Sequence, residues 1–116
     1  MADRPNPTET HLLIALRGGP SYGYALLQEL ERRSRGEISP DIGSLYRTLG
    51  RLMDRGWVQE AAAPAEAEAS PGRPRRYYGV TSEGLEALAR EIERLEDLVR
   101  LARDAGGTLG AEGAGA

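Results

Sequence analysis

The sequence predicts a mainly α-helical fold with one small β-hairpin, and three observations predict it. Apolar residues recur at helical rather than alternating spacing through most of the chain. Two short runs, residues 57–59 and 76–80, contain the aromatic and β-branched residues typical of strands. The segment between them is rich in Ala, Pro and Glu, which favours a long hairpin loop. A chain of 116 residues is long enough for one domain with one core.

The first two helices are predicted from cap residues and from the spacing of apolar side chains. Residues 1–7 are polar and broken by proline, so we expect a flexible start. Thr8 can cap a first helix over residues 9–17, after which two glycines and a proline end it. Ser21 can cap a second helix that continues to about residue 33.

The third helix has the clearest start and end. Ser39 is predicted as its N-cap, and Pro40 takes the first helical position, where its missing N–H costs nothing. Asp41 favours the positive end of the helix dipole, and the helix should end near Gly56. One apolar stripe at helical spacing is formed by Ile42, Leu45, Leu49, Leu52 and Met53.

A fourth helix is predicted to start at Thr81 or Ser82 and to cover residues 82–105. Its length of about 24 residues, roughly 36 Å at 1.5 Å per residue, exceeds what so small a core can cover. We therefore expect it to pair two copies of the chain, and the low-complexity tail 106–116 to be disordered. The residues predicted to make this heptad-type seam are Leu85, Leu88, Ile92, Leu95, Val99 and Ala102.

The composition excludes several classes of function. The chain has no cysteine and one histidine, His11, which excludes disulfides and thiolate metal sites and argues against structural zinc. His11 has no obvious carboxylate companion, so we expect no catalytic residue, cofactor or metal. No apolar run is long enough for a membrane span or a secretory signal, so we expect a cytoplasmic protein without a membrane partner.

The net charge of −3 is unevenly distributed. Residues 1–81 carry 11 arginines against 10 acidic residues, whereas residues 82–105 carry 4 arginines against 7. The acidity therefore lies mostly in the predicted C-terminal helix. Every basic residue is arginine, which can make bidentate contacts to phosphate and guanine that lysine cannot make.

The second and third helices, joined by a short turn, have the layout of a helix-turn-helix. The second helix of such a pair enters the major groove with its N-terminal residues nearest the base edges. The face opposite the apolar stripe carries Ser44, Arg47 and Arg51, which are then placed to reach bases or flanking phosphates. A solvated helix surface is the alternative. With the hairpin as a wing, residues 8–81 are predicted to form a winged helix-turn-helix DNA-binding domain.

Two further segments are candidate DNA contacts. In the hairpin, Arg73, Arg75 and Arg76 surround a proline that keeps the backbone extended toward a phosphate ridge or a minor groove. A solubilising loop is the alternative. Ser21 and Tyr22 lie where the N-terminus of the second helix offers N–H groups to a phosphate. The neighbouring tyrosines, Tyr22 and Tyr24, are alternatively core or rim aromatics, with Tyr24 the more core-like.

These motifs resemble the PadR family of bacterial transcriptional regulators. The resemblance rests on SPDIGSLYRTLGRLMDRGWV followed by GRPRRYYGVTSEG, with YGYALLQEL in the second helix, and covers about residues 10–104. It implies a winged helix-turn-helix with a C-terminal dimerisation helix, and a homodimer on a palindromic operator in double-stranded DNA. It also implies repression that a small-molecule effector usually relieves. One C-terminal helix without a further domain is similar to the small subfamily.

Carried over by position, the resemblance assigns DNA contacts to residues of the second helix, the recognition helix and the wing. No effector site carries over, because drug-responsive members of the small subfamily stack ligands on a tryptophan in the C-terminal helix, which this chain lacks. The residues assigned to DNA are Tyr22, Ser39, Ser44, Tyr46, Arg47, Arg73 and Arg75.

Two alternative functions remain open on the sequence. The domain can be a winged-helix module that binds another protein, with its arginines meeting acidic side chains. It can also be a small-molecule-binding dimer whose contact with DNA is secondary. The sequence favours a DNA-binding transcriptional regulator over both, and an enzyme least.

Overall fold

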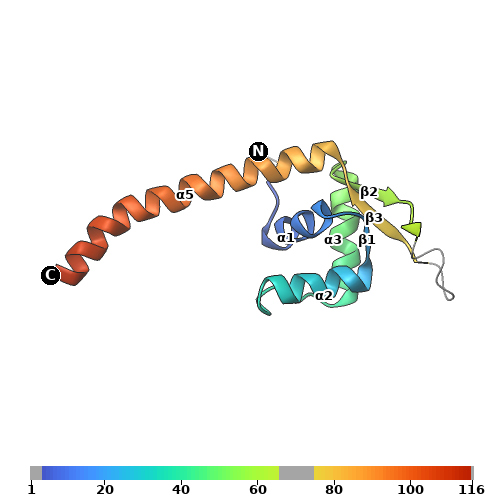
Figure 1. Ribbon diagram of the computed structural model, residues 1–116, viewed down its shortest axis with the longest axis horizontal. Coiled ribbons are helices and arrows are strands. Elements are labelled where there is room, and N and C mark those ends of the chain that lie inside the picture. The colour runs from blue at the N-terminus through green and yellow to red at the C-terminus, as the bar shows by residue number, and fades with distance from the viewer. Residues whose placement is uncertain (1–3, 66–74, 116) are drawn as a thin grey trace.

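Three helices, a three-stranded sheet and one long C-terminal helix make up the described part of the chain (Figure 1). The computed structural model describes residues 4–65 and 75–115, with side chains up to residue 105. The fold is therefore mainly helical, as predicted. In chain order the elements are α1 (Pro7–Arg17), β1 (Ser21–Tyr22), α2 (Gly23–Arg33), α3 (Ile42–Asp54), β2 (Val58–Ala61), β3 (Tyr77–Val80) and α5 (Ser82–Gly115).

Helix α1 begins earlier than predicted, because Asn6 rather than Thr8 is its N-cap. The Asn6 side chain accepts a hydrogen bond from the backbone N–H of Glu9 (2.8 Å), and the Glu9 carboxylate accepts one from the backbone N–H of Asn6 (2.9 Å). This reciprocal pair is a capping box, and Pro7 fills the first helical position. Two donors are satisfied at once, which a cap at Thr8 would not achieve.

The caps predicted for α2 and α3 were also wrong. Ser21 lies in β1, and Tyr22 precedes α2 as its N-cap without a side-chain hydrogen bond. Asp41 caps α3 by accepting from the backbone N–H of Ser44 (2.7 Å), so Ser39 and the following proline lie before the helix. Hydrogen bonds from the backbone and the side chain of Ser44 lower the pKa of the Asp41 carboxyl, because they favour its charged form. The end of α3 before Gly56, which has φ 77°, is as predicted.

The sheet has one strand more than the predicted hairpin. Its order is β1-β3-β2 with both pairs antiparallel, and β1 pairs Ser21 with Tyr78 and Tyr22 with Tyr77. The hairpin strands β2 and β3 pair from Val58 opposite Val80 to Ala61 opposite Tyr77. A two-residue strand is too short to produce an alternating pattern, which is why β1 was not foreseen. The middle of the predicted wing loop, residues 66–74, lies outside the described residues.

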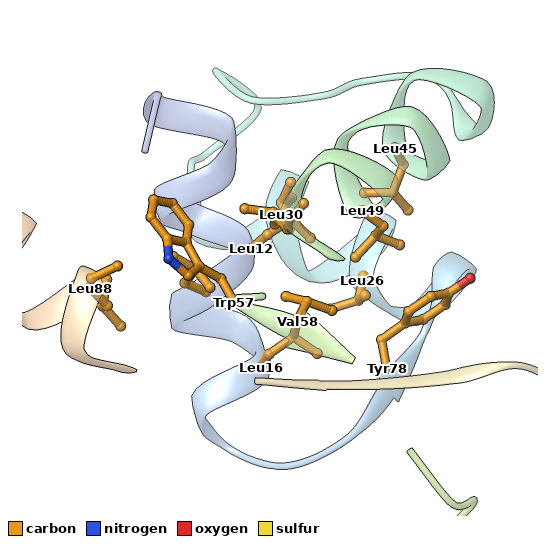
Figure 2. Packing of buried hydrophobic residues seen from close by; sticks show 13 residues of the cluster. Leu12, Leu16, Leu26, Leu30, Leu45, Leu49, Trp57, Val58, Tyr78 and Leu88 are labelled. Atoms are coloured by element: carbon orange, nitrogen blue, oxygen red, sulfur yellow. The ribbon is translucent and has the colours of Figure 1, made fainter. Parts of the chain in front are cut away.

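One hydrophobic core joins the three-helix unit, the sheet and the first part of α5 (Figure 2). Leucines from α1, α2 and α3 meet at its centre, and the core is closed by Val58 and Tyr78 of the sheet and by Trp57, just before β2. Leu88 brings α5 onto the same cluster. The leucines that Figure 2 labels on the three helices are Leu12, Leu16, Leu26, Leu30, Leu45 and Leu49.

A compact joint connects the sheet to α5. The Thr81 hydroxyl donates to the backbone carbonyl of Gly56 (2.6 Å) and accepts from the N–H of Gly84 (3.0 Å). The backbone N–H of Thr81 donates to the carbonyl of Trp57 (2.9 Å). Gly84 passes so close to this carbonyl that a Cβ on it would overlap the Trp57 backbone. Thr81 therefore caps α5, and the direction in which α5 leaves the sheet is tightly defined.

The predicted seam of α5 divides into two parts. Leu88 is 1% exposed and Ile92 is half-buried, because they pack on the chain's own core. Leu88 is therefore not available to a partner helix, contrary to the prediction. Farther along, α5 projects away from the core (Figure 1). The large apolar side chains exposed on α5 are Leu85, Leu95, Leu98, Val99 and Leu101.

Helix α5 also extends past residue 105, where it was predicted to end. The segment assigned to a disordered tail contains no proline to remove a backbone donor, and the helix continues through it to Gly115. Within the described residues, no helix combines the length and apolarity of a membrane-spanning segment.

Candidate nucleic-acid interface

The first residues of α2 and α3 lie close together, and a side chain of α3 holds them there. The turn between the helices contains two residues of positive φ, Arg35 and Gly36, which let the chain reverse. Tyr46 of α3 lies against Gly23, where any Cβ would overlap its hydroxyl end. The ring of Tyr46 also contacts that of Tyr78 on β3, with centroids 6.4 Å apart. Tyr46 thus links α3, the start of α2 and the sheet.

The structure brings together two of the residues predicted to read DNA. Arg47 donates a hydrogen bond from Nη2 to the hydroxyl of Ser44 (2.9 Å). Arg47 is exposed on the side of α3 opposite the buried Leu45 and Leu49, and Ser44 is half-buried. Because Ser44 also lies in the first turn of α3, the pair occupies the N-terminal part of a helix whose outer surface is open.

Arg51 is not a free cation, although the sequence groups it with Arg47. Its Nε lies 3.6 Å from a carboxylate oxygen of Glu9, and its Nη2 donates to the hydroxyl of Thr48 (3.2 Å). Glu9 comes from α1 and its side chain is 2% exposed, whereas the side chain of Arg51 is 52% exposed. One edge of the Arg51 guanidinium is therefore held by Glu9 and Thr48, while much of the side chain is exposed to solvent.

Arg75 and Tyr22 form a stack beside β1. The guanidinium carbon of Arg75 lies 4.5 Å from the ring centroid of Tyr22, within the range of a cation–π contact. Tyr22 in turn meets Tyr77 edge to face, with centroids 5.4 Å apart. Tyr22 is therefore a half-buried rim aromatic rather than a core residue. Tyr24, which was expected to be core-like, is 62% exposed.

Arg76, a candidate DNA contact of the wing, lies just before β3 and is ion-paired across the sheet. Its guanidinium forms an ion pair with Glu60 of β2, with Nε 2.9 Å from the carboxylate oxygen. The hydrogen bond from Arg76 to Glu60 raises the pKa of Arg76, because it favours the charged form. Its guanidinium carbon also lies 5.8 Å from the ring centroid of Tyr78. Arg73 lies outside the described residues.

The sequence-based reasoning missed several residues that organise this surface. Glu9 is the most consequential, because its buried carboxylate contacts two arginines of and just after α3. A signal was present: Asn6 followed three residues later by Glu9 is the pattern of a capping box. Gly23 and Tyr77 could not have been identified, because their roles depend on contacts with distant elements.

The fold and this surface define a winged helix-turn-helix protein: α2 and α3 form the helix-turn-helix, and β2 and β3 flank the wing. Residues 12–90 match the family model described as "Transcriptional regulator PadR-like family". The chain therefore belongs to this family of transcriptional regulators, which are not enzymes. Over the described residues, no group of three or more His, Asp or Glu side chains is arranged to hold a metal ion.

Solved structures of the same family share the fold. A PadR-like transcriptional regulator from Bacillus cereus has a TM-score of 0.67 and 22% identity, covering 83% of this chain and 87% of that one. A PadR family transcription regulator from Clostridium difficile has a TM-score of 0.64 and 24% identity, covering 82% of this chain and 95% of that one. At 22% and 24% sequence identity, these two structures show that the fold is shared.

A curated relative is described as an uncharacterized 37.1 kDa protein in transposon TN4556 of Streptomyces fradiae. It is 34% identical over 95 residues, which make up 82% of this chain. The chain spans only 25% of that protein's length.

Proposed function

We propose that this regulator binds a palindromic DNA operator as a homodimer and represses transcription until a small molecule relieves the repression. The observation that carries the DNA-binding part is the capped helix α3, on which Arg47 is exposed and bonded to Ser44, together with the Arg75–Tyr22 stack next to the start of α2. A basic recognition helix next to a basic wing matches a major groove and its flanking phosphates.

In this proposal the side chains divide by role. Arg47 reads base edges, since arginine binds guanine O6 and N7 in a bidentate manner. Ser44 accepts a hydrogen bond from Arg47 and so orients it, and Ser44 itself lies near the same major groove. Tyr22, Tyr46 and Arg75 contact phosphates or the minor groove, where they fix the register of the helix. Arg76 plays a smaller part, because its ion pair with Glu60 holds the guanidinium against β2.

The distal half of α5 is the proposed dimer contact. It bears a groove of about 590 Å³ whose apolar lining includes Leu95 and Val99, flanked by Glu96, Arg100 and Arg103. Leu98 and Leu101 are exposed next to it. A second copy would bury these side chains, and it would place two recognition helices for major grooves about 34 Å apart. Charges beside an apolar seam can select the pairing of the two helices.

Val99→Asp is expected to convert the dimer to a monomer. Val99 is 48% exposed in the single chain, so the substitution leaves the core intact but places a carboxylate in the proposed seam. Light scattering should give a mass near the 12.5 kDa of one chain instead of twice that value, with helical circular dichroism retained. Arg90→Ala, an exposed change on the same helix, should leave the dimer intact. A dimeric Val99→Asp protein would place the interface elsewhere.

Selection of bound sequences from a random duplex pool by the purified protein tests the whole proposal. The expected result is an inverted repeat whose half-sites are separated by about one helical turn. A pool without enrichment would reject sequence-specific binding and favour a protein-binding module. Enrichment of one half-site without symmetry would reject the palindromic operator.

Repression and its relief are tested separately, in cells. A reporter gene placed behind the selected operator should be less active with the regulator than without it. Higher activity would make the protein an activator. The proposal of an effector is supported by family membership, and compounds that release the protein from the selected operator in a gel shift would identify one.

A further inference from the structure

A buried carboxylate lies beneath the recognition helix. Glu9 has one oxygen 3.1 Å from Nη1 of Arg55 and the other 3.6 Å from Nε of Arg51. The oxygen that faces Arg55 also accepts from the backbone N–H of Asn6 (2.9 Å). A single acid at the start of α1 therefore holds two cations at and beyond the last turns of α3, more than 40 residues away in sequence.

This arrangement fixes Glu9 more firmly than a surface ion pair. The capping box restrains both its backbone and its side chain, and the core surrounds it. Arg55 is restrained as well, because its guanidinium carbon lies 5.0 Å from the ring centroid of Trp57. A charge that is taken out of water needs such partners, so Glu9 is a rigid anchor for the arginines that approach it.

The anchor distinguishes Arg51 from Arg47. Among the described residues, Arg47 donates to the hydroxyl of Ser44 and its charge acts on Asp41, so both of its neighbours lie at the start of its own helix. In Arg51, Glu9 engages Nε and Thr48 engages Nη2, which leaves Nη1 as the nitrogen without a partner among the described residues. Arg51 follows Arg47 by one turn of α3, so the two residues lie on one side of the helix, and both are exposed.

We infer that Glu9 is a positioning residue for DNA binding: it holds the guanidinium of Arg51 by its inner edge so that the outer edge meets one backbone phosphate. This inference rests on the proposed DNA-binding function. Glu9 itself does not touch DNA. An arginine whose orientation is already fixed loses less rotamer freedom when it binds phosphate, so a nearby negative charge strengthens binding to a polyanion.

The test measures the salt dependence of binding to a duplex of mixed sequence, for the wild type, Glu9→Gln, Arg51→Ala and the double variant. Each phosphate contact contributes about 0.9 to the slope of log affinity against log salt concentration. Glu9→Gln should lower the slope by about 1.8 for a dimer that loses two contacts, although it removes negative charge. Arg51→Ala should lower the slope equally, and the double variant should show no further loss.

Arg51→Lys provides a second test that leaves the buried carboxylate unchanged. Lysine keeps the charge, but its single ammonium cannot engage Glu9, Thr48 and a phosphate at separate nitrogens. Since lysine keeps the charge, the salt slope should stay near that of the wild type, but the affinity at a fixed salt concentration should fall below it. An affinity equal to that of the wild type would overturn the inference, because an unpositioned charge would then suffice. This variant remains informative if Glu9→Gln fails to fold.

Glu91→Gln is the matched control. Glu91 is also a buried carboxylate bound by arginines, Arg94 (2.6 Å) and Arg4 (3.7 Å), but it lies on α5. The hydrogen bond from Arg94 lowers the pKa of Glu91, so its replacement removes a comparable charge. The control should keep the wild-type slope.

The outcomes separate this inference from the proposed function. A wild type that binds no duplex would reject DNA binding itself. A wild type that binds, with Glu9→Gln showing an unchanged or steeper slope, would reject only the role of Glu9. A Glu91→Gln slope as low as that of Glu9→Gln would also reject it, since any loss of a buried charge would then have the same effect.

Discussion

Arg47→Ala is expected to abolish sequence-selective retention of DNA while leaving the dimer intact. A bidentate arginine–guanine pair contributes about 1–3 kcal/mol of discrimination, and a symmetric dimer makes it twice, so selectivity should fall by about 30-fold or more. Little stability should be lost, because Arg47 is exposed and its hydrogen bond to Ser44 lies at the surface. Capping of α3 by Asp41 uses a backbone N–H and survives the change.

The measurement is a gel shift with the selected operator and with a scrambled duplex of equal length. The ratio of the two affinities should approach one for Arg47→Ala, and light scattering should still report a dimer. Arg90→Ala, which removes an exposed arginine from α5, should keep the wild-type ratio. If selectivity persisted in Arg47→Ala, α3 would not be the element that reads the bases.

Gly84→Ala is expected to destabilise the protein strongly, even though alanine is the better helix former. A Cβ at this position would overlap the Trp57 carbonyl and approach a methyl group of Val80, and the backbone cannot give way as a flexible side chain could. Overpacking of this kind costs about 1–3 kcal/mol. For a chain of this size the melting temperature should fall by roughly 5–15 °C.

Gly50→Ala is the matched control for this prediction. Gly50 lies inside α3 and has open space where a Cβ would point. The substitution should raise stability by about 0.5–1 kcal/mol, because it relieves the entropic cost of a helical glycine. Thermal unfolding followed by circular dichroism compares the two variants directly. A Gly84→Ala protein as stable as Gly50→Ala would mean that the joint between the sheet and α5 is loose.

The helices could be predicted from the sequence because their apolar spacing is a local property. Their starts were less predictable, since several suitable cap residues occur close together: Thr8 lies near Asn6, and Ser39 near Asp41. Which residue caps a helix depends on where the chain turns, and that is set by the packing of the whole domain. Strand β1 was missed because its two residues gain their pairing from β3, more than 50 residues later.

The site could be predicted only in part, for a related reason. Ser44 and Arg47 were grouped correctly because both lie on one helix, where spacing determines which side chains are neighbours. Helical spacing placed Arg51 on that face, and the proline-extended wing made Arg76 a candidate contact, but neither pattern could show that Glu9 and Glu60 engage them. Those partners come from other elements. Sequence spacing thus identifies which face carries charge, whereas the fold determines how much of that charge is free.

The tight joint around Gly84 has a mechanical consequence for the proposed dimer. One additional base pair between half-sites moves the second site by about 3.4 Å and turns it by roughly 35° around the DNA axis. A dimer whose DNA-binding domains were flexibly attached to α5 could adapt to this displacement. Here Gly84 packs closely against the carbonyl of Trp57, and the hydroxyl of Thr81 joins the first turn of α5 to Gly56, just after α3. The dimer would then hold its two recognition helices at a fixed distance, so that it selects operators by the spacing of their half-sites as strictly as by their base sequence.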